Sequence, residues 1–80
     1  MDALDKIEEL GWSKSNIFPS ITKSGGLKIT VIGCPEKWNA LVEELKGVNR
    51  LDLESDTKLY DFQDYAEENN KITIKFKLVS

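Results

Sequence analysis

The stretch KITIKFKLV, residues 71–79, alternates apolar side chains with lysine or threonine as far as Leu78. Successive side chains of an extended chain point to opposite faces, so the apolar residues share one face and the lysines the other. The apolar face consists of Ile72, Ile74, Phe76 and Leu78. We therefore predict a strand over 71–79 that packs one face on the core and leaves its lysine face open to water.

Upstream of this strand, the residues 27–32 (LKITVI) alternate and then become β-branched, which is typical of a largely buried strand. Pro35 suits the first position of a following helix, because it lacks an N–H group that would be unpaired there. The helix, over 35–46, has one apolar stripe made of Trp38, Leu41, Val42 and Leu45. A strand over 48–53 follows. Together these elements predict a β-α-β unit with a right-handed crossover.

The N-terminal third predicts a helix and a hairpin. Leu4, Ile7 and Leu10 recur at helical spacing, and Asp2 can cap a helix over 2–10. A strand over 16–22 contains Pro19, which confines it to a sheet edge or a loop. A glycine-rich turn then joins it to the strand at 27–32 as a hairpin.

Residues 55–70 admit two interpretations. As a helix, the segment has Ser55 or Asp56 as its cap; as a strand, it pairs through a turn at 67–70 with the strand that follows. We prefer the helix. The predicted fold class is then α+β, with a small mixed β-sheet, helices packed on one face, and the order α-β-β-α-β-α-β.

The composition limits what the chain can do. Its 80 residues, 40 % of them hydrophobic, suffice for one core and not for two, so we expect a single domain over 1–80. There is no histidine for a zinc site or a catalytic relay, and the single Cys34 has no partner for an internal disulfide. The net charge of −3 has the wrong sign for a general nucleic-acid binder, and no stretch approaches the ~20 apolar residues of a membrane span. We expect a cytoplasmic protein that uses no cofactor and binds neither nucleic acid nor membrane.

Acidic side chains are concentrated in residues 52–68, which hold seven acids against a single base, Lys58. On a helix Asp61, Asp64 and Glu68 share one face, while the apolar residues dock on the other. Such a face attracts a basic partner, and neighbouring tyrosines supply contact area at low entropic cost. The predicted binding residues are Asp56, Tyr60, Asp61, Asp64, Tyr65 and Glu68. The other interpretation is a solvated face that keeps a small domain in solution.

A metal site is not expected in this acidic segment. Asp52, Glu54 and Asp56 alternate as the first ligands of a calcium loop do. The sixth position, however, holds Thr57 where the sharp turn needs glycine. The twelfth holds Gln63 where the loop needs a bidentate carboxylate.

Cys34 is the residue whose side chain is best suited to covalent chemistry. It precedes Pro35 at the predicted helix N-terminus, where unpaired N–H groups and the helix dipole favour a thiolate. The other interpretation is a small apolar side chain that fills the corner between strand and helix.

The run Cys34-Pro35-Glu36, its helix, and the segment Tyr65-Ala66-Glu67-Glu68-Asn69 resemble the TusA-like (SirA-like) sulfur carrier proteins over residues 28–76. In that family a Cys-Pro-x-Pro motif begins the first helix, and its cysteine carries a persulfide that passes between partner proteins. The resemblance implies that Cys34 is the persulfide site. Lys37 stands where the family has its second proline.

Two functions follow from these patterns. The first is a small acidic, non-catalytic protein-binding module, for example an inhibitor or immunity-type factor for a partner with a basic surface. The alternative is a TusA-like sulfur carrier that uses Cys34. We expect the first, because the acids and tyrosines offer a surface and the chain is too short for a deep pocket.

Overall fold

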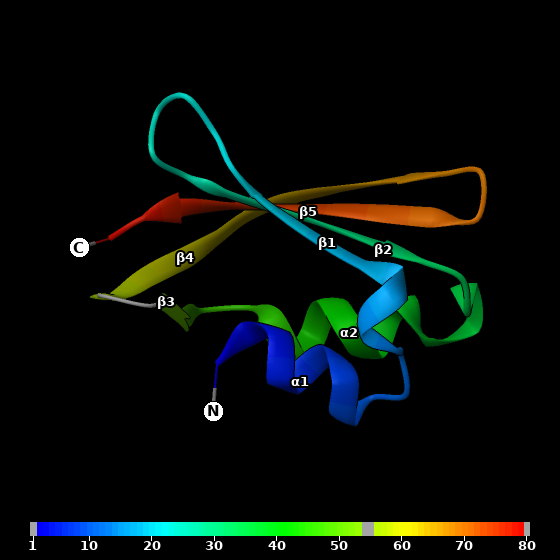
Figure 1. Ribbon diagram of the computed structural model, residues 1–80. Helices are drawn as coiled ribbons and strands as arrows, with labels where there is room; N and C mark the ends of the chain where they lie inside the picture. The colour runs from blue at the N-terminus through cyan, green and yellow to red at the C-terminus, as the bar shows by residue number, and fades with distance from the viewer. Residues whose placement is uncertain (1, 54–55, 80) are drawn as a thin grey trace.

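The computed structural model describes residues 2–53 and 56–79, which form one sheet with two α-helices on one of its faces (Figure 1). The elements are α1 (Ala3–Glu9), β1 (Ile17–Ile21), β2 (Leu27–Ile32), α2 (Trp38–Leu45), β3 (Val48–Leu53), β4 (Asp56–Glu68) and β5 (Lys71–Leu78). Single 3-10 turns over Lys14–Asn16 and Pro35–Lys37 precede β1 and α2. Within the described residues, neither α-helix is long and apolar enough to span a bilayer.

The sheet has the strand order β1-β2-β5-β4-β3, and each neighbouring pair is antiparallel. The alternating strand at the C-terminus, β5, lies at its centre, with Ile72, Ile74 and Phe76 buried under the helices. Lys71, Lys75 and Lys77 are exposed on the opposite face, which no helix of the described residues covers. The α+β class, the hairpin of β1 with β2, and the open lysine face are confirmed.

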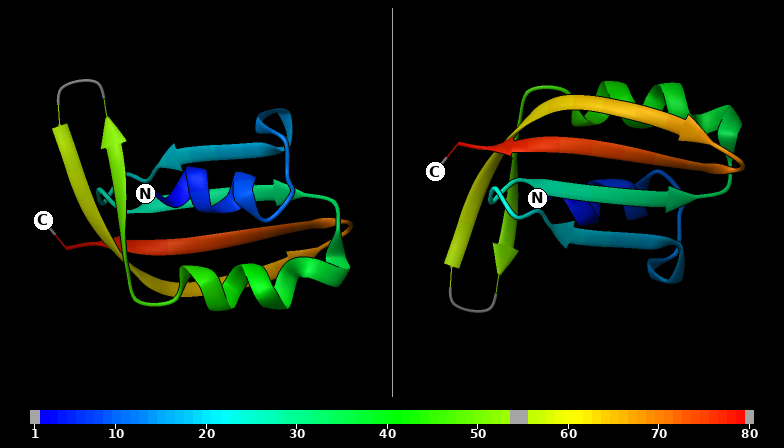
Figure 2. Two further views of the ribbon diagram at one scale, coloured as in Figure 1. Left: turned by 90° about the horizontal axis from the view of Figure 1, so that it is seen from below. Right: turned by 90° about the horizontal axis from the view of Figure 1, so that it is seen from above.

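The predicted β-α-β unit is wrong. β3 does not lie parallel beside β2: it forms the far edge of the sheet and pairs antiparallel with β4. The right-handed crossover rule applies to parallel neighbours, and α2 instead carries the chain beneath the sheet to its opposite side (Figure 2). The sheet is therefore antiparallel throughout the described strands and not mixed.

The preferred helix over 55–70 is also wrong, and with it the predicted element order, which becomes α-β-β-α-β-β-β. This segment contains β4, which pairs over Tyr60–Glu68 with β5. Burial explains the outcome: as a strand it places Tyr60 and the half-buried Phe62 on the core side, while the two-residue turn Asn69-Asn70 returns the chain directly into β5. Ser55, one of the two caps considered, lies outside the described residues.

A β-bulge between Phe62 and Asp64 inserts Gln63 into β4 opposite β5. Bulges bend the strand that carries them and increase its twist. Figure 2 shows that the first part of β4 and its partner β3 run across the direction of β1, β2 and β5.

The core contains one buried polar residue among those described, Asn49 at the start of β3. Its Nδ2 group donates to the Leu45 carbonyl at 2.6 Å, which satisfies a free acceptor at the end of α2. Its Oδ1 atom accepts from Lys6 Nζ of α1 at 3.1 Å. Asn49 thus ties both helices to the sheet.

The corner between β2 and α2 depends on Gly33. Its φ of +93° lies in the region that favours glycine, and Cys34 follows it at a φ of +53°. The Gly33 carbonyl accepts from Trp12 Nε1 at 3.1 Å and from Trp38 Nε1 at 2.9 Å. The Gly33 N–H donates to the Asn70 carbonyl at 2.8 Å in the β4–β5 turn.

We predict that Gly33→Ala lowers the free energy of unfolding by about 1–2 kcal/mol, the usual cost of a left-handed backbone for an L-residue with a side chain. No atom lies within 4 Å of the added Cβ, so the loss would come from the backbone alone. Gly33→Asn should lose less, because asparagine tolerates positive φ. Urea unfolding measures both variants, and an unchanged stability of Gly33→Ala would contradict this corner geometry.

Candidate functional site

β4 is longer than the strand that covers its outer side. β3 pairs with β4 from Asp56 to Asp61, and the Phe62 N–H still donates to the Gly47 carbonyl at 3.0 Å. From Gln63 to Glu68 no strand of the described residues lies on the outer side, and each of these residues is exposed. This outer edge, Gln63–Glu68, is the candidate site.

The direction of the backbone groups follows from the ladder between β4 and β5. The Val79 N–H donates to the Leu59 carbonyl at 2.8 Å, so every second residue of β5 from Val79 back to Lys71 directs its backbone groups at β4. Ala66 and Glu68 are register partners of that set. Tyr65 and Glu67 therefore direct their N–H and C=O groups outward, away from β5. The Tyr65 N–H donates there to the Oδ1 atom of Asp64 at 2.7 Å.

The two other outer edges of the sheet are less suited to an added strand, although β1 is also exposed over Phe18–Ile21. β1 carries Pro19 among its outward-directed residues, which removes a donor. β1 and β3 also converge on an apolar cleft of about 200 Å³, which Ile21, Leu51 and the α1 residue Leu4 line. The residues of the outer edge of β4 are each exposed, and α2 lies alongside this part of β4 on the helix side of the sheet (Figure 2).

Three of the predicted binding residues, Asp61, Asp64 and Glu68, lie on one face of β4, although β4 is a strand and not a helix. That face is the open face of the sheet, and in the β4–β5 register each acid stands directly opposite a lysine, namely Lys77, Lys75 and Lys71 in that order. Cross-strand neighbours of opposite charge attract each other, so the lysines of β5 offset part of the predicted negative potential.

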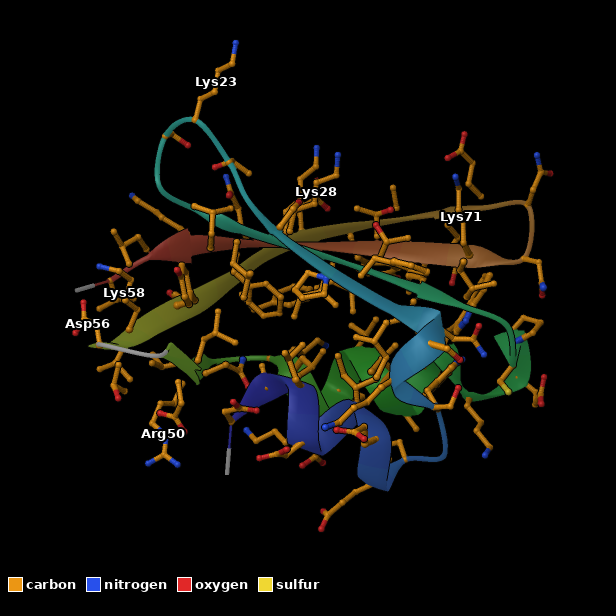
Figure 3. The ribbon with its side chains drawn as sticks, in the orientation of Figure 1. Lys23, Lys28, Arg50, Asp56, Lys58 and Lys71 are labelled. Carbon is orange, nitrogen blue, oxygen red and sulfur yellow. The ribbon has the colours of Figure 1, made fainter. Side chains whose placement is uncertain are left out.

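The other predicted residues are spread along β4. Asp56 is at its beginning, with its Oδ2 atom 3.3 Å from Lys58 Nζ (Figure 3). Tyr60 is 0 % exposed and belongs to the core, so it cannot contact a partner in this fold. Tyr65 is 42 % exposed on the outer edge, with its ring centroid 6.4 Å from that of Phe62. The structure thus joins Tyr65, Asp64 and Glu68 at the site and separates Asp56 and Tyr60 from it.

Glu67 was missed by the sequence reasoning. It lies on the side of the sheet that faces the helices, opposite Ile72, where no lysine balances it. On a helix its position carries no special meaning, whereas on a strand it shares a face with Tyr65 two residues earlier. The Asn69-Asn70 turn was the signal that could have identified it.

Cys34 is half-buried and packs against the core. The helical turn after it, Pro35–Lys37, has three residues and 3-10 geometry, and α2 begins at Trp38. This arrangement favours the interpretation of Cys34 as a side chain that fills the corner.

Among the described residues, no cysteine and acidic side chains form a group that could hold a metal ion. Comparisons with protein-family models, with curated proteins and with solved structures found no match to this chain. The site therefore has to be interpreted from its own geometry.

We predict that charge reversal lowers stability more at Glu68 than at the adjacent Glu67. Glu68→Lys places a lysine directly opposite Lys71 and should cost about 0.2–1 kcal/mol of stability, because like charges repel across a strand pair. Glu67→Lys faces Ile72 and should change stability by less than about 0.5 kcal/mol. Urea unfolding at low and high salt measures both, and equal effects would contradict the assigned faces.

For Cys34 we expect slow alkylation by iodoacetamide in the native protein and fast alkylation in denaturant, because the thiol is packed against the core. Mass spectrometry follows the reaction over time. Fast native labelling would contradict the packing role and support the persulfide alternative.

Proposed function

We propose that this protein is a non-catalytic binding module that takes up an extended, basic segment of another protein as an additional strand on the outer edge of β4. The observation that carries the proposal is the exposed run Gln63–Glu68, which presents backbone donors and acceptors without a strand partner in the described residues. Strand addition to such an edge is a recurrent mode of peptide recognition, in which the main chain supplies affinity and the side chains supply specificity.

The charges of the edge support a basic occupant. Asp64 and Glu68 project on the open face and Glu67 on the other, so acids flank the edge on both sides. A lysine- or arginine-bearing strand is attracted to this pattern, whereas the β4 edge of a second copy would bring acids against acids. The same charges therefore discourage self-association and favour a basic partner.

Tyr65 provides an anchor for the partner. Phe62 packs edge to face on Phe76, with ring centroids 6.2 Å apart, and the Tyr65 ring lies tilted against Phe62. Its position is thus supported from the core, and a supported aromatic ring offers contact area at low cost in conformational entropy. Inhibition of the partner, or an immunity-type role, is one form of this function when the bound segment borders the partner's active site.

The direct test uses a ten-residue peptide that alternates lysine with valine. We expect the Glu67 amide to exchange rapidly with solvent in the free protein, because it points outward, and the Ala66 and Glu68 amides to be protected. The Tyr65 amide should exchange at an intermediate rate, because it points outward but donates to Asp64 Oδ1. Saturating peptide should slow exchange at Tyr65 and Glu67. Hydrogen exchange followed by NMR resolves the four amides separately.

Two variants give this test its control. Glu67→Pro removes an outward donor and should abolish peptide binding without removing a bond to β5. Ile21→Pro makes the matching change on the outer edge of β1 and should leave binding intact. Binding that is insensitive to Glu67→Pro in a folded variant, or equal binding of a glutamate–valine peptide, would overturn the proposal.

A further inference from the structure

The open face of the sheet contains a feature that the β4 edge does not use. A shallow depression of about 680 Å³ lies where the β1–β2 hairpin meets β5, and it is lined by Lys28, Lys75, Lys77, Thr22, Ser24 and Gln63. The hairpin rises above the sheet on the side away from the helices (Figure 1). Lys28 projects from the sheet on that same side (Figure 3). This volume is within the usual range for small-ligand sites.

Two lysines of the depression repel each other across neighbouring strands. Lys28 of β2 and Lys75 of β5 stand directly opposite each other in the register, and Lys77 follows Lys75 on the same face. Like charges directly opposite in a strand pair destabilise the sheet. An anion bound between them would remove this repulsion, so the free protein is poised to gain stability from such a ligand.

Acidic side chains of the described residues stand near the depression but neither line it nor form ion pairs with its lysines. In the described part of the chain, the cations of the ion pairs are Lys46, Arg50 and Lys58, so no carboxylate is within 4 Å of the three lysines. Asp61 and Asp64 stand opposite Lys77 and Lys75 on β4 but do not line the depression. The bulge residue Gln63 lines it instead and offers a neutral amide.

Hydroxyl groups complete one wall. Thr22 Oγ1 accepts from the Gly26 N–H at 3.0 Å and lies 3.1 Å from Ser24 Oγ, so the turn holds both hydroxyls in place. One of the two hydroxyls donates to the other, which leaves three ammonium groups, one hydroxyl and one amide to donate to an anion with several oxygen atoms. We propose that this depression binds the phosphate groups of a small phosphorylated molecule, an activity separate from strand addition at the β4 edge.

The test titrates the protein with sodium pyrophosphate at constant ionic strength, held with sodium chloride. We expect amide shifts to concentrate on the hairpin, Gln63 and the segment around Lys75. Lys75→Gln should raise the dissociation constant for pyrophosphate by roughly tenfold, which corresponds to the loss of one charge-assisted hydrogen bond. This variant removes the repulsion with Lys28 together with the attraction to Asp64, so urea unfolding is measured alongside to show that it remains folded when binding is lost.

Lys71→Gln is the matched control, since Lys71 is on the same strand and the same face but outside the depression. Its binding should stay within about twofold of wild type, given its distance from the bound charge. Equal weakening by both variants would show a diffuse charge effect and overturn the site.

A ten-nucleotide oligothymidylate serves as the second probe. Adenosine triphosphate is titrated in the same way. If the oligothymidylate binds to the depression while pyrophosphate and adenosine triphosphate do not, the small-ligand proposal is wrong. Glu67→Pro should leave pyrophosphate binding unchanged, so failure at the β4 edge and failure here are distinguishable.

Discussion

The peptide groups on either side of Gly33 join parts of the chain that are far apart in sequence. The carbonyl receives the indole N–H groups of Trp12, just after α1, and of Trp38, the first residue of α2. The N–H reaches the turn between β4 and β5. Each bond contributes about 0.5–1.5 kcal/mol net, which is considerable for a domain whose total stability is expected near 5–15 kcal/mol. Both helices and the far hairpin are therefore positioned from one corner.

This constraint also positions the candidate site. The outer edge of β4 extends beyond β3 and is held by its pairing with β5 and by the Asn70 carbonyl that Gly33 binds. Without an anchor at its turn, a hairpin end of this kind frays, and an edge that frays cannot offer a fixed row of donors and acceptors. Lys37 Nζ adds a second tie beside this corner, because it donates to the Leu10 carbonyl at the end of α1. The helices thus support this strand edge from one side of the sheet.

The sequence predicts best where the signal is local. β5, the β1–β2 hairpin and the apolar stripe of α2 each follow from a period that one short segment displays completely. The position of β3 could not be predicted in this way, because it depends on which strand is its partner. The predicted parallel crossover paired it with β2, whereas it pairs with β4. The candidate site inherited that difficulty. Asp64 and Glu68 share a face on a helix or on a bulged strand, but the exposure of Tyr65, the burial of Tyr60 and the role of Glu67 depend on the strand.

One inserted residue, Gln63, interrupts the alternation of faces along β4. In an unbroken strand that continues from the Phe62–Phe76 pair, Gln63 would stand opposite Lys75, Asp64 would turn toward the core side opposite Ile74, and Tyr65 would face water. The bulge shifts the register by one, so Asp64 moves to the open face opposite Lys75 and Tyr65 comes to lie against Phe62. Phe62 and Tyr65, three residues apart, then share a face. The irregularity that hid the strand from its sequence pattern is also what keeps a carboxylate off the core side, supports the exposed tyrosine and places a neutral amide among the lysines of the depression.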